Sequence, residues 1–496
     1  MIRKVLLCCR GEIAMRFVRT CRELGIDTVV NYPLEDEGAP YVMAADERVA
    51  MRAQSPAEAI PEVIAAAKLT NADAVAPGYG PLAENADFAE LCAAQGLIFV
   101  GPSASAIRLS GDKLKARLTA EAAGLPVVPG ATMPADADSC VQAARRIGFP
   151  VIVKAVLGGG GRGIRVAADE GELVGALQDV RREAQNAFGS AEIYVERFLG
   201  EQVRHIEVQI LADRHGRMVH LGDRECSVQR RRQKVVEEAP APNLDDEVRR
   251  GLHRAALDMA KAIGYDNAGT VEFLVDPDGT FYFIEMNARI QVEHPVTESV
   301  YGVDIVDHMI RSAAGEPLSL DQKNLGAVGH AIEFRICAED PLGNFLPAAG
   351  ALTSYVVPEG PGVRIDSGIA SGAVQSPRFD SLCMKLILHG RDRAQALHRA
   401  SQALRELRIT GFPTNVPLHL WLLRHPNFVG GDYDLGIVGD FNLSGQEKSR
   451  ISTELAVIAA LSTFLTGHED PTSGPLQKDC APSRWRLRNE PRSYTR

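Results

Sequence analysis

The strongest constraint on the fold is a pair of alternating apolar runs that indicates a β-hairpin. The runs Gly269–Val275 and Thr280–Asn287 are joined by Pro277-Asp278-Gly279, a composition typical of a tight turn between antiparallel strands. Successive residues of a strand point to opposite faces, so residues two apart share a face. The hairpin therefore predicts antiparallel sheet here, and it decides which polar side chains project together.

Three oxygen-bearing side chains are expected on one face of that hairpin. Glu285 and Asn287 are two residues apart, and Glu272 stands across the hairpin within reach of them. Two carboxylates and an amide oxygen are hard ligands of the kind that Mg²⁺ or Mn²⁺ prefers beside bound phosphates. Isolated acids usually line a solvated strand face, but both strands are otherwise apolar. The pattern therefore favours a metal site.

A glycine-rich loop supplies a reason for such a metal. Strand pattern over Pro150–Ala155 carries Lys154, the glycines Gly158–Gly161 follow, and strand pattern resumes over Gly163–Ala167. Glycines have no Cβ, so the backbone N–H groups of such a loop can approach phosphate oxygens, and Lys154 can reach the same phosphates. The loop is not a Walker A motif, because no Gly-Lys-Ser/Thr follows. A flexible hairpin loop without a ligand is the alternative.

A third cluster follows the hairpin directly. Arg289 can hold a small oxyanion through two hydrogen bonds, and Glu293 is a candidate general base if its surroundings raise its pKa. The basic set Arg230–Lys234 precedes the hairpin, and a solvated turn is its simpler interpretation. Lys234 and Arg335 become anion-site candidates only if the fold brings them to Arg289, which spacing alone leaves open.

Strand and helix patterns alternate over the first hundred residues. Strands are expected at Val5–Cys8, Thr28–Tyr32, Ala72–Ala76 and Leu97–Val100, with helical patterns between them such as Glu12–Leu24. This alternation predicts a doubly wound α/β unit with a parallel sheet. No G-x-G-x-x-G motif follows the first strand, so the unit is not interpreted as a dinucleotide site.

The remaining patterns indicate further units. The stretch Arg204–Gly315 is rich in strands, and a third unit with strands His330–Cys337 and Met384–His389 follows it. A chain of 496 residues agrees with about three domains of roughly 150 residues each. A helix is expected over Lys448–Leu465, and a disordered tail or truncated linker from Gly467 onward.

Composition excludes several classes of function. The net charge of −10 implies no general affinity for nucleic acid. The chain begins with a short strand-like run instead of a secretory signal, and no run of about 18 or more apolar residues suggests a membrane span. Nine scattered cysteines without a C-x-x-C pair favour reduced thiols. A cytoplasmic protein that binds neither nucleic acid nor membrane is expected.

Beyond these patterns, a series of motifs resembles the biotin carboxylase family of the ATP-grasp superfamily. The motifs occur in the family's order over about residues 1–441, and the run Asn287–Glu298 is highly specific. They are Arg10-Gly-Glu-Ile-Ala14, Pro77-Gly-Tyr-Gly80, Glu84-Asn85, Gly111-Asp-Lys113, the glycine loop, Gln229-Arg-Arg231, the run from Gln233 to Pro240, the run from Phe283 to Asn287, and the run from Arg289 to Glu298.

The resemblance implies a mixed α/β and α+β architecture in three domains. A Rossmann-like, pre-ATP-grasp N-terminal domain would span residues 1–110. An ATP-grasp domain would span 111–315, with a mobile lid over about 132–199, and a biotin carboxylase C-terminal domain would span 328–441. Residues 442–496 would add a helix and a disordered tail.

The resemblance also implies an activity. Members of this family use Mg-ATP to phosphorylate bicarbonate, and CO₂ released from the resulting carboxyphosphate carboxylates N1 of biotin. The implied cofactors are ATP and two Mg²⁺ or Mn²⁺ ions, with biotin as a substrate carried on a separate protein. The implied partners are a biotin carboxyl carrier protein, the carboxyltransferase subunits of an acetyl-CoA or other acyl-CoA carboxylase, and a second copy in a homodimer.

Matching motifs carry the family's site residues onto this chain. Glu293 would deprotonate bicarbonate, Arg335 would stabilise the biotin enolate, and Tyr79 would line the biotin pocket. The residues implied to hold bicarbonate are Lys234, Arg289, Gln291 and Val292. Those implied to bind metal are Glu272, Glu285 and Asn287. Those implied to contact ATP are Lys113, Lys154, Gly160, Gly161, Glu196, Leu199, His205, Gln229, Glu272 and Glu285.

Several positions depart from the family's usual pattern around the nucleotide and biotin pocket. None removes a metal or bicarbonate residue, so they put turnover, nucleotide affinity or carrier choice in doubt more than the reaction class. Another ATP-grasp ligase, of carbamoyl-phosphate or amino-acid type, and a degenerate non-catalytic subunit stay open as alternatives. The departures are Cys9 for Asn, Ala76 for His, Pro81 for Phe, Ala83 for Ser, Leu157 for Gly and Arg232 for His.

We predict that the chain carboxylates biotin only in trans. Ile451–Leu465 and Ser483-Arg-Trp-Arg-Leu-Arg488 resemble the start of the region after the biotin carboxylase unit in fused acyl-CoA carboxylase α chains, and no Met-Lys-Met biotinylation motif occurs. A plain disordered tail explains the same residues. After co-expression with a biotin ligase, a streptavidin blot should label a co-purifying small protein. A labelled band at the chain's own mass would contradict the prediction.

Overall fold

The computed structural model describes residues 2–133, 137–156, 163–376 and 378–441, together with 457, 460 and 461. The described chain up to Phe441 forms one compact unit. Leu157, Gly160 and Gly161 lie outside the described residues, as does most of the segment 442–496. The phosphate-binding loop, the C-terminal helix and the tail therefore stay predictions.

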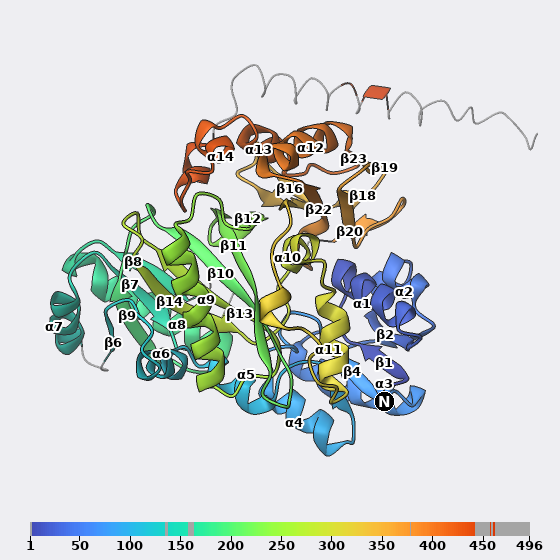
Figure 1. Ribbon diagram of the computed structural model, residues 1–496, viewed down its shortest axis with the longest axis horizontal. Helices are drawn as coiled ribbons and strands as arrows, with labels where there is room; N and C mark the ends of the chain where they lie inside the picture. Colours follow the sequence, from blue (N-terminus) through green and yellow to red (C-terminus); the bar gives the residue numbers. More distant parts are fainter. Residues whose placement is uncertain are drawn as a thin grey trace, which may run out of the picture. The chain divides into compact units, whose positions relative to one another are not determined.

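The N-terminal region is the expected doubly wound α/β arrangement, drawn in blue in Figure 1. Its five-stranded sheet has the order β3-β2-β1-β4-β5, and its four strand pairs are parallel. Sequence pattern missed only β3 among these strands, because β3 is a largely exposed edge strand with little apolar signal. The elements are β1 (Lys4–Leu7), α1 (Gly11–Glu23), β2 (Asp27–Pro33), η1 (Leu34–Asp36), α2 (Pro40–Ala44), β3 (Glu47–Met51), α3 (Pro56–Thr70), β4 (Ala74–Ala76), α4 (Ala86–Ala94), β5 (Ile98–Phe99) and α5 (Ala104–Gly111).

The elements within the predicted lid have a sheet and an apolar core of their own. The sheet order is β6-β9-β7-β8, antiparallel throughout, and α7 and α8 pack against it (Figure 1). Leu177 of α8 joins Val153 and Val195 of the strands in a core separate from the others. After α6 (Lys113–Ala122) the elements are β6 (Gly130–Thr132), α7 (Ala137–Ile147), β7 (Val151–Ala155), β8 (Ile164–Ala167), α8 (Glu170–Phe188) and β9 (Ile193–Arg197).

The largest sheet runs through both of the later predicted domains. Its eight strands follow the order β14-β13-β10-β11-β12-β15-β22-β20, and every neighbouring pair is antiparallel. The pairing of β12 with β15 joins the predicted ATP-grasp and C-terminal domains in one hydrogen-bonded ladder, which sequence pattern did not predict. The strands are β10 (Arg204–Ala212), β11 (Met218–Arg230), β12 (Gln233–Ala239), β13 (Asn267–Val275), β14 (Phe281–Asn287), β15 (His330–Cys337), β20 (Val363–Ser367) and β22 (Leu382–Gly390).

Helices cover this sheet, and α10 matters most for the site. It packs on β11, β12, β15 and β22 and has Pro295 in its first turn. It ends at Tyr301 and is followed by Gly302, whose φ of 64° suits a helix C-terminus. The helices are α9 (Asp246–Ala262), α10 (His294–Tyr301), α11 (Ile305–Ala313), α12 (Arg393–Glu406), α13 (Val416–Leu422) and α14 (Pro426–Gly430), with the 3₁₀ helices η2 (Gln322–Asn324) and η3 (Ile437–Asp440). The remaining short strands are β16 (Glu339–Asp340), β17 (Leu346–Pro347), β18 (Gly350–Ala351), β19 (Ser354–Val356), β21 (Val374–Gln375) and β23 (Arg408–Thr410). Among the described helices, none has the length and apolar character needed to cross a membrane.

We predict that the segment from about Thr132 to Leu199 closes over ATP as a lid. Its separate sheet and core allow it to move as a body, and a reactive phosphorylated intermediate must be shielded from water. Limited proteolysis should cut this segment more slowly when Mg-ATP is added, while Mg²⁺ alone should leave the cleavage rate unchanged. Cleavage that ignores the nucleotide would contradict the lid.

Candidate active site

The β13–β14 hairpin brings the three predicted metal ligands together. Glu272 stands directly opposite Glu285 in the antiparallel register, so the two carboxylates share one face of the sheet. Asn287 lies two residues beyond Glu285 and donates from Nδ2 to Glu272 Oε1 at 2.9 Å. The hairpin pattern therefore predicted the geometry, while the role of these residues as ligands stays a prediction.

The surroundings of these carboxylates hold Glu272 in its charged form. Burial alone would raise the pKa of Glu272, but Lys234 and His205 outweigh it and lower that pKa. His205 Nε2 lies 2.9 Å from Glu272 Oε2, and Lys113 Nζ lies 3.1 Å from Glu285 Oε2. Carboxylate oxygens gathered beside an amide oxygen are the donor set that Mg²⁺ takes, so the residues fit a divalent cation.

Lys234 is the centre of the neighbouring half of the site. From β12 its ammonium group contacts Glu207 at 2.5 Å, Glu293 at 2.7 Å and Glu272 at 3.0 Å. Arg335 of β15 reaches the other oxygen of Glu293 at 3.0 Å. The pairing of β12 with β15 thus brings Lys234 and Arg335 to one carboxylate, Glu293. Their approach to Arg289, which sequence spacing left open, stays a prediction.

The candidate base Glu293 is surrounded by cationic side chains. Its side chain is fully buried, which alone would raise its pKa. The charges of Lys234, Arg335 and Arg224 outweigh burial and hold the pKa of Glu293 well below its ordinary range. The condition stated for a general base, surroundings that raise this pKa, is therefore not met in this arrangement. Glu293 is ionised at neutral pH and can accept a proton.

Arg289 is tied to the same cluster through its guanidinium group. Nε donates to Glu84 at 2.8 Å, Nη1 to Gln291 Oε1 at 3.1 Å and Nη2 to Asn287 Oδ1 at 3.1 Å. Gln291 in turn donates to Glu272 Oε1 at 3.0 Å. The predicted anion-binding arginine is thereby held against the β13–β14 hairpin, with N–H groups at the edge of the carboxylate cluster.

Residues predicted to contact the nucleotide lie on two different sheets, the eight-stranded sheet and the four-stranded sheet of the predicted lid. On the large sheet, Gln229 Nε2 lies 2.8 Å from His205 Nδ1, beside Glu272. On the lid, Lys154 of β7 forms an ion pair with Glu196 of β9. Leu199 follows β9 in the chain. Residues predicted to contact a nucleotide thus lie on both the large sheet and the predicted lid.

Tyr79, the predicted biotin-pocket residue, belongs to a buried chain of contacts. Its hydroxyl donates to Glu12 Oε1 at 2.5 Å. Lys385 of β22 contacts Glu12 Oε2 at 3.0 Å and donates to the carbonyl oxygen of Val292 at 2.7 Å. The N-terminal region and the C-terminal strand β22 therefore both fix the loop that carries Val292 and Glu293.

Two buried residues of the cluster escaped the sequence interpretation. Glu207 lies opposite Glu272 on β10 and accepts from Arg224 Nε at 2.5 Å. Both Glu207 and Arg224 are fully buried. The sequence of β10 contains a pattern that could have identified Glu207, because His205, Glu207 and Gln209 alternate with apolar residues. The strand is buried on both faces, so these polar side chains point into the protein.

Two of the departures, Arg232 and Cys9, have contacts that the structure describes. Arg232 sits in the turn between β11 and β12 with a φ of 66°, and it donates to the carbonyl oxygen of Ile164 on the lid at 3.3 Å. Cys9 is buried against Gly78, where an added Cβ would lie 3.2 Å from its side chain. Arg232 therefore connects the strand that carries Lys234 to the lid.

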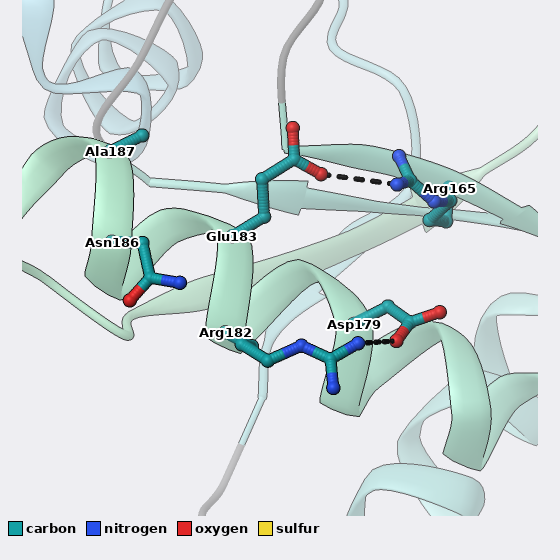
Figure 2. Close-up of a pocket in the computed structure, with 6 residues that line it drawn as sticks. All are labelled: Arg165, Asp179, Arg182, Glu183, Asn186 and Ala187. Atoms are coloured by element: carbon teal, nitrogen blue, oxygen red, sulfur yellow. Dashed lines mark hydrogen bonds and ion pairs between the residues drawn. The ribbon is translucent and has the colours of Figure 1, made fainter.

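A hollow of about 680 Å³ lies on the lid, and none of its lining residues belongs to the carboxylate cluster. Figure 2 shows its charges paired with one another: Glu183 with Arg165 at 3.2 Å, and Arg182 with Asp179 at 2.6 Å. Glu183 also accepts from the backbone N–H of Gly163 at 3.0 Å. The hollow therefore marks where α8 anchors the residue after the glycine loop. Its lining residues are Arg165, Asp179, Arg182, Glu183, Asn186 and Ala187.

Three family models match the chain in sequence. "Biotin carboxylase, N-terminal domain" matches residues 1–107, "Carbamoyl-phosphate synthase L chain, ATP binding domain" matches 112–321, and "Biotin carboxylase C-terminal domain" matches 333–440. Together they cover nearly all of the described unit up to Phe441.

Curated relatives extend over almost the same length. Biotin carboxylase 1 of Bacillus subtilis is 46% identical over 90% of this chain and 100% of its own length. Biotin carboxylase of Nostoc sp. is 48% identical over 88% of this chain and 99% of its own. One of the pyruvate carboxylase subunits of Methanothermobacter thermautotrophicus is 43% identical over 94% of this chain and 96% of its own.

Solved structures agree with these relatives. A biotin carboxylase from Campylobacter jejuni, in a complex described as β-γ-ATP, has a TM-score of 0.86 and 43% identity, covering 89% of this chain and 99% of its own. The biotin carboxylase domain dimer of the Hydrogenobacter thermophilus 2-oxoglutarate carboxylase, bound to MgADP, ADP and bicarbonate, has a TM-score of 0.86 and 42% identity, covering 89% of this chain and 98% of its own. The chain therefore belongs to the biotin carboxylase family.

Proposed function

We propose that the chain is the biotin carboxylase component of a biotin-dependent carboxylase. It would use Mg-ATP and bicarbonate to carboxylate biotin on a separate carrier protein, as an ATP-grasp ligase that forms a C–N bond. The observation that carries the proposal is the position of Glu293, whose two oxygens are held by Lys234 and Arg335. One buried carboxylate thus lies between the metal-ligand hairpin and the predicted biotin residue.

The hairpin residues are suited to activate a phosphate. Glu272, Glu285 and Asn287 would hold Mg²⁺, which supplies Lewis-acid stabilisation of the transferred phosphoryl group when bound. Lys113 and Lys154 would bind phosphate oxygens from the sheet side and the lid side. These residues neutralise charge and align two anions, which is what phosphoryl transfer to bicarbonate requires.

Glu293 would take the proton of bicarbonate. Its pKa is low because burial is outweighed by Lys234, Arg335 and Arg224. A bound bicarbonate would share the hydrogen bonds of Lys234 and Arg289, so the stabilisation of the Glu293 carboxylate would weaken and its basicity would rise. Arg335 would then face the negative charge that develops on the ureido oxygen of biotin.

The partners proposed are a biotin carboxyl carrier protein, carboxyltransferase subunits and a second copy of the chain, in the cytoplasm. The relatives include both biotin carboxylases and a pyruvate carboxylase component, so the acceptor fits an acetyl-CoA, other acyl-CoA or 2-oxoacid carboxylase. Bicarbonate-dependent ATP hydrolysis stimulated by free biotin separates this function from another ATP-grasp ligase. Nucleotide binding without phosphate release would instead favour a non-catalytic subunit.

We predict that Glu285→Gln abolishes bicarbonate-dependent ATP hydrolysis. The substitution keeps the size of the side chain but removes the charge of a metal ligand that lies opposite Glu272. Phosphate release is the measurement. Glu247→Gln, on the exposed first turn of α9, is the matched control and should keep wild-type turnover. Equal turnover of the two variants would contradict the metal assignment.

We predict that Glu293→Gln leaves Mg-ATP binding largely intact while it lowers turnover about 10²–10⁴-fold, the usual contribution of a general base. Binding is measured by titration calorimetry with a non-hydrolysable ATP analogue, and turnover by phosphate release. A variant that no longer binds nucleotide would show that Glu293 serves the nucleotide site instead.

A further inference from the structure

The sheet face beneath α10 holds more buried carboxylates than the proposed reaction uses. Glu333 and Arg335 are two residues apart on β15, so they share this face. Glu237 of β12 stands directly opposite Glu333 in the antiparallel register. Both glutamates are fully buried, and α10 packs on β12, β15 and β22. Two adjacent carboxyl groups therefore lie next to the arginine assigned to biotin.

Arg335 is held from both of its ends. Its backbone carbonyl oxygen accepts from Asn415 Nδ2 and from His419 Nε2, each at 2.9 Å. At the far end, Nη2 contacts Glu293 at 3.0 Å and also forms an ion pair with Glu237. The Nη2 nitrogen of Arg335 is thus shared by two carboxylates: Glu293, which lies in the loop before α10, and Glu237, which lies in strand β12.

The second carboxyl group of the pair has no cation of its own. Neither oxygen of Glu333 has a hydrogen bond or a close ion pair among the described residues. Lys385, opposite Arg335 on β22, is already engaged by Glu12 at 3.0 Å and by the carbonyl oxygen of Val292 at 2.7 Å. A buried carboxylate without a partner is strongly unfavourable, so it takes up a proton instead.

The pKa shifts of the two glutamates agree with a charged Glu237 and a protonated Glu333. Burial raises the pKa of Glu333 well above its ordinary range, against the opposing charge of Lys385. Burial also raises the pKa of Glu237 to about 7, where the charge of Arg335 limits the rise. Glu237 is therefore the member of the pair that more readily carries the negative charge.

We propose that Glu237 is a positioning residue that holds Arg335 at the biotin pocket while Glu293 changes charge, with the neighbouring Glu333 protonated. The inference rests on the proposed function. When the bicarbonate O–H proton moves to a Glu293 oxygen, Glu293 becomes neutral and its bond to Arg335 weakens. Glu237 then remains as the charged partner of Nη2. The guanidinium stays in place for the enolate instead of following the protonated base.

The pair of substitutions Glu237→Gln and Glu333→Gln tests this division. Both keep the shape of the side chain, but only Glu237→Gln removes a negative charge, because Glu333 is proposed to be protonated. Glu237→Gln should lower kcat/KM for free biotin about 10- to 100-fold, the range for a lost charged hydrogen bond, at an unchanged KM for ATP. Bicarbonate-dependent ATP hydrolysis without biotin should fall far less. Glu333→Gln should stay within about twofold of the wild type, because a neutral group replaces a neutral group.

Glu237→Asp is the conservative variant and keeps the charge at a shorter reach. It should show a loss between those of the wild type and Glu237→Gln, and it decides the question if Glu237→Gln does not fold by circular dichroism. Wild-type kcat/KM for biotin in both Glu237 variants would overturn the inference. An equal loss in Glu333→Gln would overturn the assignment of the proton to Glu333. A wild-type chain without biotin-stimulated turnover would overturn the proposed function, and the inference with it.

Discussion

One largely buried ammonium group, that of Lys234, holds the two halves of the site together. Lys234 contacts Glu207, Glu272 and Glu293, and these carboxylates belong to three separate segments of the chain. Burial alone would lower the pKa of Lys234, but the three carboxylates raise it well above its ordinary value. Buried charges are tolerated only when they are paired. The β13–β14 hairpin, strand β10 and the candidate base are therefore joined by the same cation.

The parts of the site that depend on local geometry could be predicted from the sequence. A two-residue period and a short turn are enough to put Glu272 opposite Glu285 and Asn287 beside them, and the structure has that register. The doubly wound N-terminal region followed from regular alternation of strand and helix patterns. Such features need only neighbours in sequence, so periodicity is sufficient for them.

The parts that depend on long-range pairing could not be predicted in this way. Lys234 and Arg335 reach the same carboxylate, Glu293, because β12 pairs with β15 across almost a hundred residues of chain, and no local pattern encodes that register. The same pairing creates the adjacent carboxyl groups of Glu237 and Glu333, to which sequence pattern assigned no role. The direction of the pKa shift at Glu293 could not be predicted for a related reason, since it is set by cations from three different strands.

The continuity of the eight-stranded sheet also limits how the chain can be taken apart. A fragment that began after α11 would lose β12 and leave β15 (His330–Cys337) with an open row of N–H and C=O groups. Long apolar edges of that kind pair with other chains and drive aggregation. In chimaeras between relatives, the exchangeable block would therefore be a whole ladder of strands, because a junction between β12 and β15 cuts through a shared structural element.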